Sequence, residues 1–191
     1  EGKVSRELLA SQIRAQPAST HAVEELLFVS MRKLEKGFER KFGAKLFKHQ
    51  IDDGSAMQQI SRFHCRDQAS LLRLAKEIIR VFSDRLNLRE LRKLSSHAEK
   101  DKLGSNKLLQ DVLAKKIGEE RARQVFGPIV GAYDLRVGDA HPTSSKIGDA
   151  LELAGIDESQ SYLRQGEQLI HNVGYSVWCI GKLLFEEKGN P

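Results

Sequence analysis

The stretch THAVEELLFVSMRKLEKGFERKF, residues 20–42, decides the fold class of this chain. Its apolar side chains recur at spacings of three and four residues and form one continuous stripe, through Val23, Leu26, Leu27, Met31, Leu34, Phe38 and Phe42. This spacing follows the 3.6-residue turn of an α-helix. Thr20 is the expected N-cap. We therefore predict an amphipathic helix here, with its stripe buried in a core.

The rest of the chain shows the same kind of pattern. Further helices are predicted over residues 4–16, 66–86, 87–100, 106–117, 119–140, 145–154 and 159–185. The Asp-Asp-Gly-Ser run near residues 50–55 marks a loop, and Gly155 fits a helix C-cap. Pro128 should kink its helix or split off the first turns. No segment alternates apolar and polar residues as a strand does.

The sequence thus predicts an all-α helical bundle as a single domain over residues 1–191, with an N-terminal helix within residues 1–18 and the bundle over residues 20–187. The helix at 66–86 is apolar on more than one side, which places it at the centre. Gly166, Gly174 and Gly181 lie about two turns apart in the last helix. Small residues at this spacing let another helix approach closely, either within the bundle or across a dimer.

Composition indicates a globular protein. Hydrophobic residues make up 40% and charged residues 30% of the chain, and its mean hydropathy is −0.44. No apolar run approaches the roughly 20 residues of a membrane span, so we expect a cytoplasmic protein without membrane contact. Cys65 and Cys179 stand apart from any metal-ligand pattern, so no metal and no cofactor are expected. The start at Glu1 suggests a domain cut from a longer protein.

Charge favours a polyanionic partner, though weakly. The formal net charge is +5, and seven basic residues occur between residues 31 and 48 against two acidic ones. A basic run is a common feature of nucleic-acid-binding surfaces. It is equally typical of a solvated helix face, which is the simpler interpretation of this one.

A second stretch, YDLRVGDAHP at residues 133–142, holds the candidate site. Pro142 disfavours helical angles at the residue before it, so the helix should end near Ala140 and leave His141 at the exit turn. On an unbroken helix, residues five apart point about 140° away from each other. A break at His141 removes this obstacle and lets the imidazole turn back toward Arg136. A fixed cation beside a group that titrates near neutrality suits phosphate chemistry.

Spacing alone does not single out this pair. Arginine and histidine occur with four to six residues between them four times, at Arg14/His21, Arg92/His97, Arg136/His141 and Arg164/His171. A random order of the same residues would give roughly 1.4 such pairs. Only Arg136/His141 combines an apolar helix before it, a helix exit at the histidine, and small residues between the two.

The passage from Tyr133 to His141, late in a helical chain and followed by further helices, resembles the signature of the HEPN superfamily (higher eukaryotes and prokaryotes nucleotide-binding). The resemblance implies a helical bundle that forms a homodimer. It also implies a metal-independent endoribonuclease of a toxin, antiphage or RNA-processing system, with RNA as substrate and an antitoxin or a further domain of the parent chain as possible partner. Arg136 and His141 would take the catalytic positions.

The chemistry needs few groups. RNA supplies its own nucleophile, the 2′-hydroxyl, so His141 would act as general base or acid and Arg136 would bind the phosphate oxygens. The product would be a 2′,3′-cyclic phosphate. Asp139 or Asp134 would orient the imidazole or pair with Arg136. Tyr175 and Trp178 are expected to be buried in the last helix, and stacking on bases is the alternative for this pair.

A structural explanation of the same residues remains open. Arg136 would then form a salt bridge with Asp134 or Asp139, and His141 would satisfy carbonyl groups at the helix end. Active HEPN members often carry a polar residue after the arginine, where this chain has Val137. The alternative function is therefore a non-catalytic helical dimerisation or accessory module of a larger defence or toxin-antitoxin protein.

Overall fold

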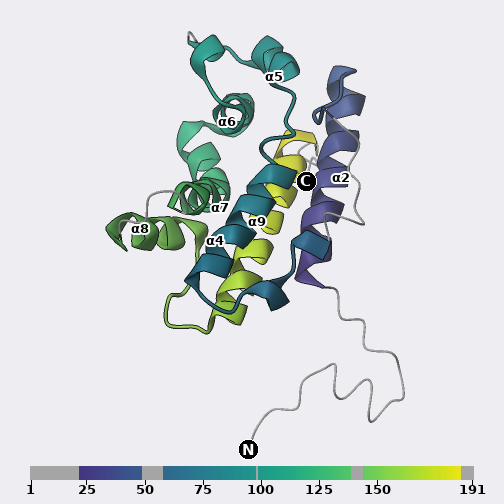
Figure 1. Ribbon diagram of the computed structural model, residues 1–191. Helices are drawn as coiled ribbons and strands as arrows, with labels where there is room; N and C mark the ends of the chain where they lie inside the picture. Colours follow the sequence, from purple (N-terminus) through teal and green to yellow (C-terminus); the bar gives the residue numbers. More distant parts are fainter. Residues whose placement is uncertain (1–21, 49–57, 98, 139–143, 186–191) are drawn as a thin grey trace, which may run out of the picture.

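The computed structural model describes residues 22–48, 58–97, 99–138 and 144–185, and within them the chain is an all-α bundle (Figure 1). Its elements are α2 (Val23–Phe42), η2 (Arg62–His64), α4 (Gln68–Val81), α5 (Leu88–Leu94), η3 (Lys100–Lys102), α6 (Ser105–Ile117), α7 (Glu119–Gly138), α8 (Ser144–Ala154) and α9 (Tyr162–Phe185). The predicted fold class is confirmed. Across these residues, no helix has both the length and the apolar character needed to span a bilayer.

The helices α2 and α9 lie side by side and run parallel (Figure 1). Gly174 faces the backbone of Leu27, and Gly181 faces Leu34 seven residues further along both helices. A side chain at Gly174 would place its Cβ 3.1 Å from the backbone nitrogen of Leu27. The two glycines therefore allow a close contact between helices of the same chain. Of the two alternatives that their spacing left open, a contact within the bundle or across a dimer, the structure shows the first. The predicted stripe of α2 supplies the other side of this contact.

Helix α4 is buried on several sides, as its sequence predicts. Leu71, Leu74, Ala75, Ile78 and Ile79 are almost fully removed from solvent, and the helix packs against α7 and α9. The helix is shorter than the predicted range of 66–86: it begins at Gln68 and ends at Val81.

The early end of α4 has a tertiary cause. After Val81 the chain turns and runs antiparallel to residues 46–48. The backbone N–H of Asn87 donates to the carbonyl of Leu46 at 2.7 Å, and that of Lys48 donates to Arg85 at 2.9 Å. Glu35 of α2 holds the partner segment by accepting from the backbone N–H groups of Leu46 and Phe47. The carboxyl pKa of Glu35 is raised, because burial outweighs these two hydrogen bonds.

The start of α4 is fixed by a capping box. The Asp67 side chain accepts from the backbone N–H of Ser70 at 2.8 Å, and the Ser70 hydroxyl accepts from the backbone N–H of Asp67 at 3.0 Å. This exchange satisfies N–H groups that a helix end otherwise leaves unpaired. Hydrogen bonds from the Ser70 side chain and backbone lower the pKa of Asp67.

Replacing Asp67 tests this cap. Since its folded pKa is lowered, Asp67 stabilises the fold above its unfolded pKa of about 3.9 and loses that contribution as pH falls through the folded value. We expect Asp67→Ala to lower the melting temperature by a few degrees at neutral pH and much less in acid. Asp67→Asn, which still caps but lacks the charge, should lose less stability than Asp67→Ala at neutral pH. Thermal melts by circular dichroism measure this, and an equal loss for both variants at neutral pH would contradict the cap.

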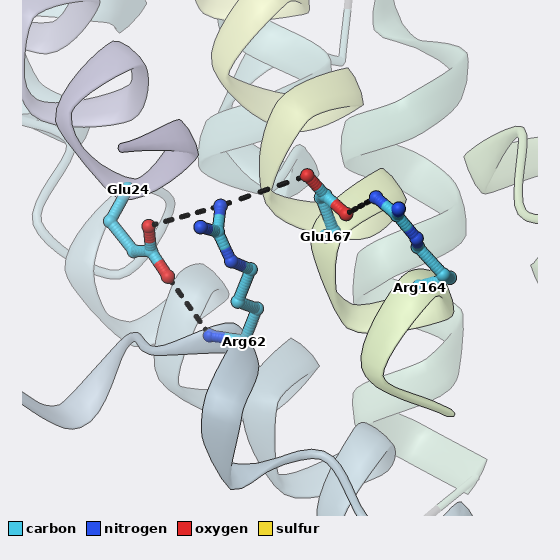
Figure 2. Close-up of polar contacts among 4 residues, drawn as sticks. All are labelled: Glu24, Arg62, Arg164 and Glu167. Carbon is cyan, nitrogen blue, oxygen red and sulfur yellow. Dashed lines mark hydrogen bonds and ion pairs between the residues drawn. The ribbon is translucent and has the colours of Figure 1, made fainter. Parts of the chain in front are cut away.

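A network of charged side chains fastens η2 to the two long helices (Figure 2). Glu24 of α2 accepts from the backbone N–H of Arg62 at 3.0 Å. The Arg62 guanidinium lies between Glu24 and Glu167 of α9, at 3.9 and 3.7 Å, and Arg164 contacts the far side of Glu167 at 2.6 Å. The carboxylate of the buried Glu24 thus has both a hydrogen bond and an ion pair, each with Arg62. We therefore assign this network a structural role.

Helix α7 continues across Pro128 as one element, so of the two predicted effects, a kink or a split of the first turns, the split is wrong. Proline removes one backbone hydrogen bond, but Phe126, Ile129 and Ala132 around it are fully buried. Their packing holds the helix together. Gly118, at φ +88°, separates α6 from α7 as predicted.

Helix α5 ends at Leu94, six residues short of its predicted limit. Asp111 of α6 accepts from the Ser95 hydroxyl at 2.7 Å and from the backbone N–H of Ser96 at 3.1 Å. These bonds turn the chain toward α6. Helix α8 ends at Gly155 (φ +70°) as predicted, and α9 starts at Tyr162, three residues late.

Several predictions fall outside the described residues. These are the helix at 4–16, the N-cap Thr20 and the loop near 50–55. Within the described part, α2 starts at Val23, and Ala22 at its N-cap position makes no side-chain cap bond.

Candidate nucleic-acid site at the end of α7

The last turns of α7 present a cation and an aromatic ring to solvent. The side chain of Arg136 is 33% exposed, and Tyr133, one turn earlier, is 44% exposed. The guanidinium carbon of Arg136 lies 5.9 Å from the centre of the Tyr133 ring. Such a pair attracts electrostatically and keeps the guanidinium near the ring. Leu135 and Ala132, on the other side of the helix, are fully buried and fix its rotation.

Arg136 is held by an ion pair with Asp84. Its Nη1 donates to both carboxylate oxygens of Asp84, each at 2.9 Å. Among the described residues, the Arg136 side chain makes no hydrogen bonds besides these two, and both use Nη1. The fork of an arginine carries further N–H donors on Nη2 and Nε, which is why arginine can hold a carboxylate and a phosphate together.

The position of Asp84 follows from the turn after α4. The backbone N–H of Asp84 donates to the carbonyl of Ile79 at 3.1 Å, and its own carbonyl accepts from the Lys48 ammonium at 3.5 Å. The neighbouring Leu86 is fully buried and pairs with Phe47. Arg136 and Asp84 are 52 residues apart in the chain, so no local sequence pattern reveals their contact.

The predicted supporting carboxylates have different outcomes. Asp134 lies on α7, where partial burial raises the pKa of its carboxyl group. The ion-pair partner of Arg136 in this region is Asp84 rather than Asp134. Asp139 and His141 lie outside the described residues, and so does the exit turn that was predicted to bring His141 to Arg136.

The other arginine–histidine pairs have separate partners. Arg92 contacts Asp101, and Arg164 contacts Glu167. His171 stacks on Tyr175 further along α9, with ring centres 6.3 Å apart and an angle of 3° between planes. Both Arg14 and His21 lie outside the described residues.

A cleft of about 240 Å³ opens beside Leu135, between α4, α7, α8 and the start of α9. It is lined mainly by Leu71, Leu72, Ile147 and Leu151, with Glu158 as the charged residue among its lining. An apolar cleft with a carboxylate at its rim does not attract phosphate. This cleft is therefore a poor candidate for a phosphate site.

The buried Cys65 is not a reactive nucleophile. The Cys65 thiol packs against Gly166, and burial, with a smaller effect of the Asp67 charge, raises its pKa to about 11. It is therefore protonated and a poor nucleophile at neutral pH. In the part of the chain that the structure describes, no group of three or more histidine, cysteine or carboxylate side chains is placed to hold a metal ion.

The structure also reveals an aromatic surface on α9. Tyr175 is 52% exposed, Trp178 is partly exposed, and their rings stack with centres 5.5 Å apart. The sequence allowed either stacking on bases or burial in the core for this pair, and Tyr175 is not buried. The signal that finds the surface is the spacing of His171, Tyr175, Trp178 and Lys182, which repeats every three or four residues along one side of a helix.

Comparisons with protein-family models, with curated protein sequences and with solved structures found no match to this chain.

Proposed function

We propose that this chain is a HEPN-like domain that binds RNA and cleaves it without a metal ion, acting as a homodimer with Arg136 and His141 as its catalytic pair. The observation that carries the proposal is the Arg136 guanidinium, which Asp84 holds at 2.9 Å beside the exposed Tyr133 ring. A fixed cation next to an aromatic ring suits a phosphate and the base attached to it.

The reaction follows from the chemistry of RNA. The 2′-oxygen attacks the adjacent phosphorus while His141 accepts the 2′-hydroxyl proton. The bond from phosphorus to the 5′-oxygen breaks, and that oxygen takes a proton from water. The products are a 2′,3′-cyclic phosphate and a 5′-hydroxyl. Arg136 would bind the non-bridging oxygens, on which negative charge grows in the transition state. Asp84 would act as a positioning residue, because it orients the guanidinium and does not contact the substrate.

The proposal is tested by incubating the chain with labelled total RNA and tRNA in EDTA, beside its His141→Ala variant. We expect cleavage that leaves cyclic phosphate ends and is lost in the variant. General acid–base catalysis contributes about 10²- to 10⁴-fold to a reaction rate, so we expect the cleavage rate to fall by a factor in this range. If a folded His141→Ala protein cleaves as fast as the parent, the site assignment is wrong.

A second function is favoured by Val137, which is 49% exposed directly after Arg136. Active HEPN members often carry a polar residue at this position, so valine here favours a chain that does not cleave RNA. The chain would then be a helical dimerisation or accessory module of a larger protein. In that case the same experiment gives no cleavage by either protein, and light scattering shows a dimer that His141→Ala leaves unchanged.

A further inference from the structure

Helices α2 and α9 lie side by side (Figure 1). Between them is a groove of about 220 Å³, lined by residues of these two helices. Its lining combines the ring of Trp178 with three cationic side chains, Lys33 and Arg40 from α2 and Lys182 from α9, and none of the described residues that line it is a carboxylate. Lys33 and Arg40 have no ion-pair partner among the described residues. An electropositive groove without neutralising carboxylates attracts a polyanion.

The aromatic side of this groove extends along α9. The rings of His171, Tyr175 and Trp178 follow one another on one side of the helix, with the Lys182 ammonium 5.0 Å from the centre of the Trp178 ring. From His171 to Lys182 this row covers roughly 16 Å of helix axis. Aromatic faces beside a row of cations form the arrangement that holds unpaired bases and their phosphates.

One polar atom in the groove lacks a partner. The Ser30 side chain lines the groove and is buried, and its hydroxyl has no hydrogen-bond partner in the described structure. Buried hydroxyl groups are nearly always hydrogen-bonded, so an unpaired one in a groove indicates a site for an outside acceptor or donor. This observation is independent of the charges and the rings.

We propose that the α2–α9 groove binds single-stranded RNA, with bases stacked on Tyr175 and Trp178 and phosphates bound by Lys33, Arg40 and Lys182. The single strand is favoured because a duplex keeps its bases stacked on each other and cannot offer them to these rings. The choice of RNA as the bound polyanion rests on the proposed function, whereas the binding groove itself does not. A second copy of the chain is a poorer occupant, because two such basic grooves repel each other.

The test is fluorescence anisotropy with a labelled oligouridine of about ten nucleotides, a length suited to a short stacking site. Its 2′-hydroxyls are methylated, so that it binds and cannot be cleaved. We expect Tyr175→Ala to weaken binding by about 5- to 100-fold and to leave binding of a duplex unchanged. Trp178 is the single tryptophan of the chain, so stacking should also quench its fluorescence.

Charge-reversal variants distinguish RNA binding in the groove from a non-specific attraction of RNA to the net positive charge of the protein. Lys33→Glu with Arg40→Glu should reduce the dependence of log affinity on log salt by about 1.4, the value for two phosphate contacts on a single strand. The matched control, Lys102→Glu with Lys107→Glu, changes the net charge equally at η3 and α6. We expect the control to weaken binding by less than about threefold.

Three outcomes would overturn the inference: no binding by the parent chain, equal binding by Tyr175→Ala, or equal losses for the groove variant and its control. A change from dimer to monomer caused by Tyr175→Ala in light scattering would assign this face to a second copy instead. The cleavage proposal is judged separately on unmodified RNA. Groove-dependent binding without cleavage refutes only the catalytic proposal, and cleavage with unaltered binding by the groove variants refutes only the groove.

Discussion

An Arg136→Ala protein is expected to cleave RNA at least about 10³-fold more slowly than the parent chain, with its fold intact. Removing one group that stabilises transition-state charge costs about 10²- to 10³-fold, and an arginine that contacts a phosphoryl group contributes up to about 10⁵-fold. The measurement is single-turnover cleavage of a labelled RNA, with a thermal melt of each protein beside it.

The structure gives a reason to expect little loss of stability. The ion pair joins side chains that are 33% and 44% exposed, and pairs with this much solvent contact contribute about 0–1 kcal/mol. Arg136→Ala also leaves the buried Leu135 next to it unchanged. A large drop in melting temperature would therefore contradict the described surface position of the guanidinium.

Asp84→Asn is the matched control for this prediction. The amide keeps an oxygen that accepts one hydrogen bond from Nη1 but loses the charge. We expect a loss of less than about tenfold in the cleavage rate, because Arg136 remains while its orientation is held less firmly. Equal losses in Asp84→Asn and Arg136→Ala would assign the carboxylate a direct role in the reaction.

Gly131→Ala is expected to destabilise the fold by about 3 kcal/mol, at the upper end of the cost of overpacking. A Cβ at Gly131 would lie 2.4 Å from the backbone nitrogen of Ala154 and 2.7 Å from the carbonyl oxygen of Ala150. These are backbone atoms of α8, so no side chain can rotate away to relieve the clash. Helix α8 must move off α7, which exposes the buried face between them.

Gly127→Ala, one turn earlier on α7, is the matched control. There the new Cβ would meet Leu153 at 3.5 and 3.6 Å, which is ordinary contact. Alanine favours a helix over glycine by about 1 kcal/mol, but Pro128 follows directly and disfavours helical angles at a residue that has a Cβ, so this variant should be close to the parent in stability. Urea unfolding of both variants gives the comparison. If Gly131→Ala is as stable as Gly127→Ala, α7 and α8 do not pack as closely as described.

Local periodicity accounts for the part of the fold that sequence alone predicts. The apolar stripe of residues 23–42 places Leu27, Met31 and Leu34 in the core, where all three are fully buried. Gly155 ends α8 because a positive φ costs glycine little, and that preference needs no tertiary contact. The same holds for the break at Gly118 before α7.

Element ends were less predictable where a distant segment competes with the helix. Residues 82–86 carry a helical pattern, but the chain leaves the helix there and pairs with residues 46–48 through the Arg85 carbonyl and the Asn87 N–H. At Pro128 the helix continues where the sequence favours a break. Its buried neighbours maintain a helix that proline alone weakens. In both cases packing outweighs a local preference of about 1–3 kcal/mol.

The sequence by itself determined that this chain forms helices, which faces of them are apolar, and that Arg136 lies near the end of one of them. Only the tertiary structure decided what surrounds that arginine and where the exposed aromatic rings lie. Asp84 reaches Arg136 across 52 residues, and Lys33 and Trp178 line one groove only because α2 and α9 pack side by side. The physical reason is that helix propensity acts over a few residues, whereas an ion pair or a groove requires two elements brought together by burial of their apolar faces.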